Sequence, residues 1–361
     1  MARNIFIFNP GPAVLPESVL ISTSNSVVNF ADTGMSIMEV SHRAKEFDDL
    51  LNDTIERLRK VMDIPDNYKI LFLQGGASTQ FAMVPINLLT PGKVADYIDT
   101  GSWSSKAIKE AKKIGTVNIA ASSKDQNYTR IPDQSELSLT PEAAYCHITS
   151  NNTIYGTQWQ SFPQTKGVPL VADMSSDILS RKINVSDFGI IYAGAQKNMG
   201  PSGVTIVIIR EDLVGLAPEN TLTMLNYVTQ ADKNSLFNTP PVTAIFVVHE
   251  VIKWIEDQGG ISEIENMNNK KAALIYEIID NSDFYRGTVE KGSRSKMNIP
   301  FRLPSEDLEK EFIAQAAQKN LIGLKGHRSV GGIRASIYNA LPLEGAQKLA
   351  EFMVDFQKNN L

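Results

Sequence analysis

Cysteine is almost absent from this sequence, and long apolar runs are missing altogether. The single cysteine, Cys146, excludes an intrachain disulfide and a zinc site built from several cysteines. It lies in an apolar run, so we expect a small buried strand residue. The longest strongly apolar stretch, 204–209, has the length of a strand and is far too short to cross a membrane. The first twelve residues lack an apolar segment of signal-peptide length, so we expect a protein of the reducing cytoplasm.

An excess of charge of one sign is also missing. The 361 residues include 35 lysines and arginines against 40 aspartates and glutamates, which gives a formal net charge of -5. This balance excludes binding to nucleic acid or to an anionic membrane through a general excess of positive charge. An anionic ligand must therefore be bound by a local basic cluster. Apolar residues make up 42% of the chain and charged residues 21%, as in soluble globular proteins, and the length allows two domains.

Short apolar runs alternate with helical patterns through the first two thirds of the chain. Most of the runs lack strict polar–apolar alternation, as expected for strands that are buried on both faces of a sheet. Their alternation with helices, as at 79–89 and 104–114, predicts an α/β unit with a mostly parallel sheet. Ligands bind beyond the carboxyl ends of such strands. The seven expected strands are 70–73, 94–98, 117–120, 144–148, 170–172, 190–193 and 204–209.

The pattern changes after Pro241, where longer helices take over. We expect helices at 242–256, 261–279, 306–319 and 344–358 and strands at 298–303 and 332–338. This mixture is typical of a smaller α+β domain. The predicted organisation is a large α/β domain over 16–257 and a small C-terminal domain over 258–361, joined by the N-terminal segment 1–15.

A lysine and an aspartate follow two of the predicted strands. Lys197 comes after the strand 190–193, in a loop of glycine and small residues, where partial desolvation would lower its pKa and make it a nucleophile able to form a Schiff base. Asp173 ends the preceding strand. If the two strands are neighbours, their ends lie about 5 Å apart. Pyridoxal phosphate requires such a pair, the lysine for its aldehyde and the carboxylate for its ring nitrogen. Considered alone, Lys197 could be a surface lysine and Asp173 a helix N-cap. Considered together, they favour a pyridoxal phosphate site.

Other strand ends carry groups that suit the rest of this cofactor. The Gly75-Gly76 turn opens a helix, whose N-terminal N–H groups could bind a phosphate. Such turns more often only connect a strand to a helix and bind no ligand. Trp103 could stack on a pyridine ring, and it could equally well cap the core. Thr153 could hydrogen-bond the ring hydroxyl.

Two His-Arg pairs supply local positive charge. One is His42-Arg43 and the other is His327-Arg328, which precedes Arg334. Arginine binds oxyanions through two parallel hydrogen bonds, so the pairs suit a doubly charged anion such as a phosphomonoester. Both histidines could also be solvated loop residues.

Taken together, these motifs resemble one known group of enzymes. From the Phe8–Ala13 segment to its end, the chain is similar to the phosphoserine aminotransferases, which are class-V, fold-type I pyridoxal-phosphate enzymes. Each motif alone has little specificity, but the combination is highly specific. The segments that carry the resemblance are Phe8–Ala13, Glu39–Arg43, Phe72–Ser78, Thr149–Ile154, Ala172–Ser176, Ala193–Asn198, Asn238–Pro241 and Gly326–Arg334.

The resemblance implies a homodimer with active sites at the subunit interface, and it implies a role for each site residue. Lys197 would bind the cofactor covalently, with Asp173 on the ring nitrogen and Trp103 on the ring face. Substrate would be bound by His42, Arg43, His327 and Arg328, with Arg334 on its α-carboxylate. The other residues implied to hold the cofactor are Gly76, Ala77, Ser78, Thr153 and Gln196 and, from the partner subunit, Asn238 and Thr239. No metal is implied.

The implied reaction is a ping-pong transamination. It converts 3-phosphohydroxypyruvate and L-glutamate into O-phospho-L-serine and 2-oxoglutarate, in serine biosynthesis and, in many bacteria, in pyridoxine biosynthesis through 4-phosphohydroxythreonine. Some bacterial members carry an arginine at the position of Ala77, which puts more weight here on the His-Arg pairs. The alternatives are another class-V enzyme acting on a different small anionic amino acid, a cysteine desulfurase, and a non-catalytic protein on the same fold.

Overall fold

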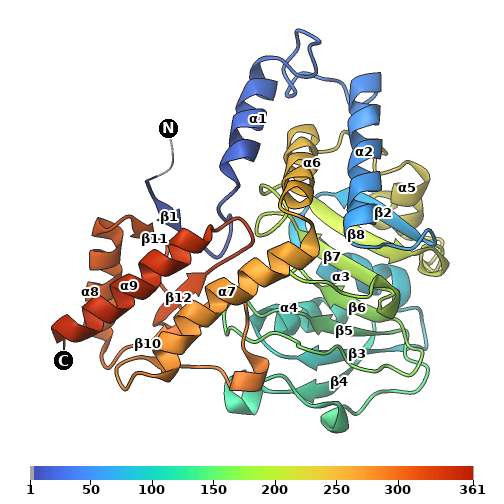
Figure 1. Ribbon diagram of the computed structural model, residues 1–361. Coiled ribbons are helices and arrows are strands. Elements are labelled where there is room, and N and C mark those ends of the chain that lie inside the picture. Colours follow the sequence, from blue (N-terminus) through green and yellow to red (C-terminus); the bar gives the residue numbers. More distant parts are fainter. Residues whose placement is uncertain (1–3, 361) are drawn as a thin grey trace.

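The computed structural model describes residues 4–360 and contains one large sheet with a smaller group of elements beside it (Figure 1). The sheet has seven strands in the order β2-β8-β7-β6-β5-β3-β4. All neighbouring pairs are parallel except those that β8 makes with β2 and β7. The predicted mostly parallel sheet is therefore confirmed. Its strands are β2 (Tyr68–Leu73), β3 (Val94–Asp99), β4 (Thr116–Ser122), β5 (Tyr145–Thr149), β6 (Leu170–Asp173), β7 (Ile190–Gly194) and β8 (Thr205–Arg210).

Both faces of the sheet are buried, which explains its uninterrupted apolar runs. In β8, Ile206 and Ile208 belong to one apolar cluster, whereas Val207 and Ile209 belong to another on the opposite face, as the two-residue period of a strand requires. Helices α1 (Glu17–Val28), α2 (Lys45–Val61) and α6 (Val242–Asp257) contribute to the first cluster. Helices α3 (Gly76–Leu88), α4 (Ser102–Ala111) and α5 (Tyr227–Asp232) lie on the other face.

The connection between β6 and β7 is less regular than a helical crossover. Residues 174–189 contain only the 3₁₀ helix Val185–Asp187, and Met174 N–H donates to Tyr192 O at once after β6. The residue after Asp173 is thus bound directly to β7. The other 3₁₀ helices are Lys124–Gln126, Gln134–Glu136, Glu211–Leu213, Thr223–Leu225 and Lys291–Ser293.

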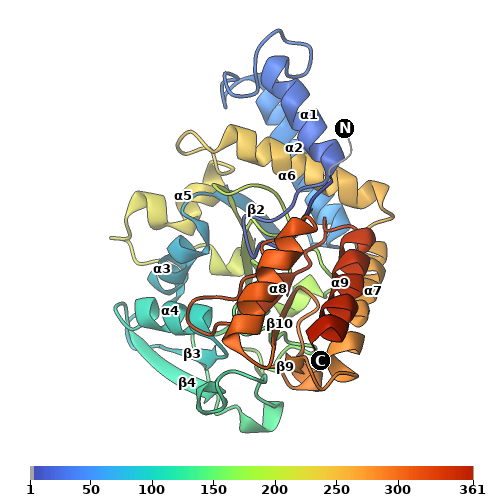
Figure 2. The same cartoon turned by 90° about the vertical axis from the view of Figure 1, so that its left-hand side faces the viewer.

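The C-terminal elements form their own aromatic-rich core beside the sheet (Figure 2). Helix α7 (Ile261–Asp280) runs from one core to the other, since Ile264 packs in the first and Ile275 in the second. The division after Asp257 itself stays a prediction. The N-terminal β1 (Phe6–Ile7) pairs with β11 (Leu321–Ile322), so the N-terminal segment packs against the C-terminal elements. The remaining elements are β9 (Arg286–Gly287), β10 (Asn298–Arg302), α8 (Glu306–Gln318), β12 (Ile333–Ser336) and α9 (Leu343–Asn360).

Several element boundaries differ from those expected. Helix α3 begins at Gly76, three residues earlier than predicted, because Gly75 turns the chain with a φ of +89°. A Cβ on Gly75 would lie 1.9 Å from Thr79 Oγ1, so glycine is required there. Within residues 4–360, none of the helices combines the length and apolar character needed to span a bilayer.

Candidate active site

A cavity of about 130 Å³ lies beyond the carboxyl ends of β5, β6 and β7, where the topology of an α/β sheet places ligands. The N-terminal turns of α3 and α4 close its other side. Its lining is mostly small and polar. The lining residues are Gly76, Ala77, Ser78, Trp103, Thr149, Asn151, Thr153, Asp173, Ser175, Ser176, Gln196 and Lys197.

Lys197 is the only lysine among the residues that line this cavity. Its Nζ donates a hydrogen bond to Thr153 Oγ1 at 2.7 Å and lies 5.8 Å from the centroid of the Trp103 ring. The pKa of Lys197 is lowered to about 8, mainly by burial; the nearby Asp173 opposes this shift, and the positive charge of Arg334 adds to it. A Cβ on Gly11 would lie 3.2 Å from the Lys197 side chain, so the N-terminal segment also packs closely against it. The amine is therefore held in place and is easily deprotonated.

Asp173 is the last residue of β6 and is buried on the cavity wall. Strands β6 and β7 are parallel neighbours, which confirms the arrangement expected from the sequence. One carboxylate oxygen, Oδ1, accepts a hydrogen bond from the Ser175 N–H at 2.9 Å. Burial raises the pKa of Asp173, and the Lys197 charge acts in the opposite direction. Among the described residues it has no ion-pair partner, so it is placed to accept a cationic N–H from a ligand.

The first turn of α3 offers free donors to the same cavity. Backbone N–H groups at positions 76–78 have no intrahelical acceptor, since an α-helix leaves its first N–H groups unpaired. Gly76, Ala77 and Ser78 all line the cavity. Together with the helix dipole, these N–H groups form a site for an anion. None of the three α3 residues carries a carboxylate that would repel it.

Two buried polar atoms at the cavity have no partner within residues 4–360. They are Thr149 Oγ1 and Trp103 Nε1. Trp103 lies on α4, in the first turn after the Gly101 N-cap, and its ring is half-buried. Unpaired buried polar groups are costly, which points to a ligand or water that would satisfy them.

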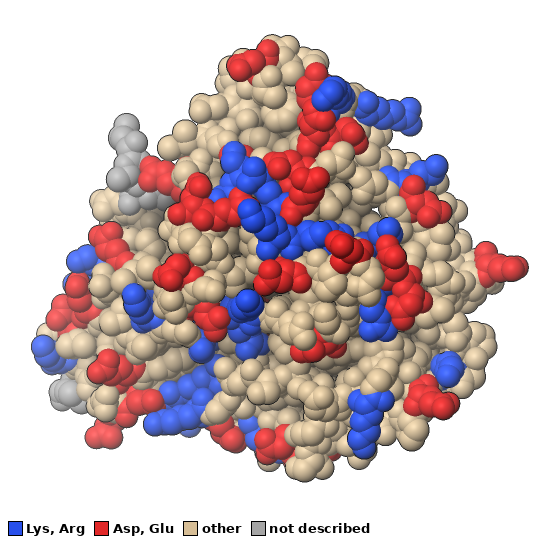
Figure 3. Space-filling view, turned by 45° about the vertical axis from the view of Figure 1, so that its right-hand side comes forward, with Lys and Arg blue, Asp and Glu red and all other residues tan. Residues whose placement is uncertain are grey.

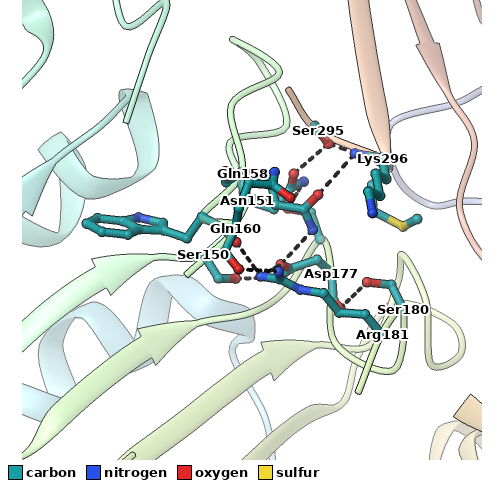
Figure 4. A network of polar contacts seen from close by, with 12 residues as sticks. Ser150, Asn151, Gln158, Gln160, Asp177, Ser180, Arg181, Ser295 and Lys296 are labelled. Atoms are coloured by element: carbon teal, nitrogen blue, oxygen red, sulfur yellow. Dashed lines mark hydrogen bonds and ion pairs between the residues drawn. The ribbon is translucent and has the colours of Figure 1, made fainter. Parts of the chain in front are cut away.

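A buried polar network supports the loop after β5 (Figure 4). Asp177 accepts hydrogen bonds from Ser150 Oγ and from Gln158 Nε2, the latter at 3.1 Å, and Arg181 lies 3.8 Å away. Asn151 donates to Ser176 Oγ at 2.8 Å. Through these bonds the loops after β5 and β6 hold each other, which fixes the wall that carries Asp173.

Arg334 on β12 reaches this wall from the C-terminal part of the chain. Its Nη1 donates to the Thr153 carbonyl at 3.0 Å, and its Nε has no partner among the described residues. The side chain is buried, and burial lowers the pKa of Arg334. A buried guanidinium without a carboxylate is suited to bind an anionic ligand.

The Gly326–Gly332 loop before β12 carries His327 and Arg328. His327 Nδ1 accepts a hydrogen bond from the Ser329 N–H at 3.2 Å, so the proton of the neutral ring lies on Nε2. Burial lowers the pKa of His327, with further contributions from Arg334, Arg328 and Lys106. All three positive groups are therefore close enough to His327 to disfavour its charged form. Arg328 is exposed.

Seven predicted site residues do not line the cavity: His327, Arg328 and Arg334, described above, and four that lie elsewhere in the chain, His42, Arg43, Asn238 and Thr239. His42 and Arg43 belong to the segment that joins α1 to α2, which forms the top of Figure 1, and neither residue lines the cavity. Asn238 lines a separate cavity of about 240 Å³, and the Thr239 carbonyl accepts a hydrogen bond from Gln74 Nε2 at 3.0 Å. The roles of these four residues stay predictions.

Sequence reasoning missed several residues of the site. Thr149 and Asn151 belong to the same strand end as Thr153, and their position at or just after the end of β5 was the available signal. Lys106 carried no signal, because a lysine in an amphipathic helix usually belongs to the solvated face. Within residues 4–360 no cluster of three or more histidine, cysteine, aspartate or glutamate side chains could hold a metal ion.

Comparisons with known proteins agree over the whole chain. The family model described as aminotransferase class-V matches residues 5–349. A phosphoserine aminotransferase of Desulfosudis oleivorans is 58% identical, with 100% of both chains covered. The structure of the Bacillus circulans subsp. alkalophilus phosphoserine aminotransferase superposes with a TM-score of 0.97 at 54% identity, covering 99% of each chain. A pyridoxal-phosphate-bound phosphoserine aminotransferase of Trichomonas vaginalis has a TM-score of 0.93 at 37% identity, covering 97% of this chain and 99% of its own.

Proposed function

We propose that this chain, which belongs to the class-V aminotransferase family, is a pyridoxal-phosphate-dependent phosphoserine aminotransferase. It interconverts 3-phosphohydroxypyruvate plus L-glutamate and O-phospho-L-serine plus 2-oxoglutarate. The observation that carries this proposal is the placement of Asp173 and Lys197 on one cavity, beyond adjacent parallel strands, in a chain that matches such enzymes over its full length.

The residues around the cavity fit the cofactor. Its phosphate needs donors without a competing carboxylate, and the first turn of α3 supplies them. Its aldehyde needs an amine that can be neutral, which Lys197 provides. Its ring nitrogen needs a carboxylate that is not already in an ion pair, and among the described residues Asp173 forms none. The unpaired Thr149 hydroxyl adds a donor at the same wall.

When bound, pyridoxal phosphate acts as an electron sink for the bond that breaks at the substrate α-carbon. With the cofactor bound, Lys197 Nζ would move the proton at the substrate α-carbon, because a pKa of about 8 leaves part of this amine unprotonated near pH 7. Thr153 Oγ1 orients this amine through its 2.7 Å hydrogen bond. Asp173 keeps a proton on the facing ring nitrogen, and Trp103 covers the cavity and excludes water.

We propose that the substrate is oriented by its two anionic ends. The Arg334 guanidinium, which also holds the Thr153 carbonyl, binds the α-carboxylate. His327 Nε2–H and Arg328 on the neighbouring loop bind the phosphate or the distal carboxylate. A single pocket of this kind serves phosphoserine and glutamate in turn. It would serve 4-phosphohydroxythreonine as well, because that substrate has the same end groups.

The proposed enzyme is a homodimer with each site completed by the partner. Support comes from His42, Arg43, Asn238 and Thr239, which do not line the cavity of their own chain. Large apolar side chains on the surface add further support. One exposed set lies on α1 and the connection to α2, and another lies at 222–237. The residues are Ile21, Val27, Val28, Met35 and Met38 in the first set and Leu222, Met224 and Phe237 in the second.

Complementation between two inactive variants tests this shared site. Lys197→Ala and Arg43→Ala homodimers should each have little activity. A heterodimer of the two carries one site with both residues intact, so random reassembly should restore about a quarter of the wild-type activity. The matched control mixes Lys197→Ala with Lys197→Met, which should restore nothing. If the first mixture also restores nothing although heterodimers form, Arg43 does not act across the interface.

The reaction itself is tested by comparing amino donors. With 2-oxoglutarate as acceptor, we expect kcat/KM for phosphoserine to exceed that for aspartate or alanine at least about 100-fold, because a phosphate brings more charge and more acceptor oxygens to His327 and Arg328 than a carboxylate or a methyl group does. A preference for aspartate would instead favour another class-V aminotransferase with a small anionic substrate. No turnover with any donor would contradict the proposal.

The remaining alternatives are disfavoured by particular residues. A cysteine desulfurase needs a mobile, reactive thiol, but Cys146 is fully buried in β5, and burial raises the pKa of its thiol to about 12. A non-catalytic protein would have no need for a buried lysine and aspartate on one cavity. The buried free thiol also agrees with our proposal that the enzyme works in the reducing cytoplasm.

A further inference from the structure

Lys106 is an exposed lysine beside the active site that none of the roles above uses. It lies on α4, three residues after Trp103 and therefore on the same face of the helix. Its Nζ is 4.1 Å from the centroid of the Trp103 ring. Among the described residues no carboxylate pairs with it. The cation–π contact thus fixes the position of a charge that remains available to a ligand.

The Trp103 ring places this charge close to the reacting amine. Lys197 Nζ lies 5.8 Å from the same centroid, so the two amines can be no further apart than the sum of the two distances. Lys106 also acts electrostatically on His327, together with Arg328 and Arg334. Lys106 is therefore near both the cofactor cavity and the loop that carries the basic groups.

The charge of the substrate explains what an additional cation would do there. A phosphomonoester carries close to two negative charges at neutral pH, whereas the burial and the cationic neighbours of His327 favour its neutral form. On α3 the cavity is lined by Gly76, Ala77 and Ser78, which bring no charge. Within this chain, the single positive charge of Arg328 would therefore balance only part of the two negative charges of the phosphate.

We propose that Lys106 is a specificity-determining residue, whose ammonium group, held over the Trp103 ring, helps to bind the distal anionic end of the substrate. This inference rests on the proposed function. It predicts a larger effect on the doubly charged phosphate of phosphoserine than on the singly charged carboxylate of glutamate. A merely structural role, in which Lys106 steadies Trp103, would instead change the turnover of both substrates alike.

Three variants of the holoenzyme separate these roles. Lys106→Met keeps the length of the side chain and removes its charge, and Lys106→Arg keeps the charge. Lys109→Met is the matched control, because Lys109 is exposed on the same helix and has no partner among the described residues. KM and kcat are measured for phosphoserine and for glutamate, and inorganic phosphate is used as a competitive inhibitor at several ionic strengths.

For Lys106→Met we expect KM for phosphoserine to rise about five- to tenfold with kcat almost unchanged, as for one lost charge-assisted contact at a partly exposed site. KM for glutamate should rise less, phosphate should inhibit less, and the salt dependence of kcat/KM should become shallower. Lys106→Arg should restore most of the loss, and Lys109→Met should resemble the wild type.

Two results would overturn the inference. One is an unchanged KM for phosphoserine in Lys106→Met. The other is an equal loss of kcat with both substrates, which would assign Lys106 to the support of Trp103. A wild-type enzyme that transaminates glutamate but not phosphoserine would be a failure of the proposed function, and it is recognised before any variant is made.

Discussion

At the scale of single residues, burial determines the protonation of the two central groups. It lowers the pKa of Lys197 and raises that of Asp173, and each charge partly offsets the shift of the other. The sequence predicted this pair because both residues directly follow apolar runs that only a buried strand explains. It could not predict the 2.7 Å contact of Lys197 with Thr153, since side-chain contacts between distant loops leave no local pattern.

Replacing the aspartate tests its assigned role. Asp173→Asn removes the negative charge and keeps the size, so we expect a protein that still turns yellow with pyridoxal phosphate through Lys197, with kcat lowered about 100-fold or more. The control is Asp187→Asn, which changes an exposed carboxylate in the same β6–β7 connection and should leave kcat unchanged. An Asp173→Asn enzyme that keeps half of its activity would contradict the assignment.

At the scale of elements, a buried lysine joins α7 to the turn after β12. Lys271 is fully buried, and its Nζ donates to the carbonyls of Ile337 and Tyr338 at 3.0 and 2.8 Å. The carbonyls of Asn339 and Leu341 lie at 3.4 and 3.1 Å from the same Nζ. The same turn contains Asn339, whose N–H donates to Asn198 Oδ1 at 3.0 Å, next to Lys197. The apolar period of α7 predicted the helix, but it could not reveal a buried lysine, which breaks that period.

Removing this amine should destabilise the protein. Lys271→Met leaves the carbonyls without a donor, so we expect the free energy of unfolding in urea to fall by about 2 to 4 kcal/mol. The control is Lys270→Met, since Lys270 is exposed on the adjacent position and should change stability by less than about 0.5 kcal/mol. Equal effects of the two substitutions would contradict the structural account.

The effect of Lys271→Met should also depend on pH. Burial lowers the pKa of Lys271 to about 7, from 10.5 for an ordinary lysine. Between these two pH values the unfolded state binds more protons than the folded state, so the contribution of this lysine to stability rises with pH. The difference in unfolding free energy between wild type and variant should therefore grow from pH 7 to pH 10. A constant difference would show that the four carbonyl oxygens keep the ammonium form.

At the scale of the whole molecule, our proposal gives one chain only part of each active site, and large apolar side chains remain exposed on its surface. Acidic and basic side chains intermix over the face in Figure 3, so this face has no field of one sign. Met38 and Val28 are 69% and 78% exposed. The sequence predicted the sheet and its ligand edge from periodicity, but exposed apolar residues can be recognised only when the fold shows which of them remain unburied.

Disrupting this surface should separate the subunits. Met38→Glu places a charge on the apolar set of α1 and its connection, so we expect light scattering to report the 39.8 kDa monomer in place of a dimer of twice that mass, with loss of activity. Ile114→Glu is the control, because Ile114 is an exposed apolar residue elsewhere, after α4. A wild-type protein that is already monomeric and fully active would contradict the shared site.

The central claim is that one cavity, built around Lys197 and Asp173, exchanges an amino group with phosphoserine. The most direct test is the absorption spectrum of the purified protein with pyridoxal phosphate, recorded before and after phosphoserine is added alone. The account predicts a yellow protein that loses its colour with phosphoserine and regains it with 2-oxoglutarate, and a Lys197→Ala variant that does neither. A yellow protein whose spectrum ignores phosphoserine, or a protein that never takes up the cofactor, would contradict it.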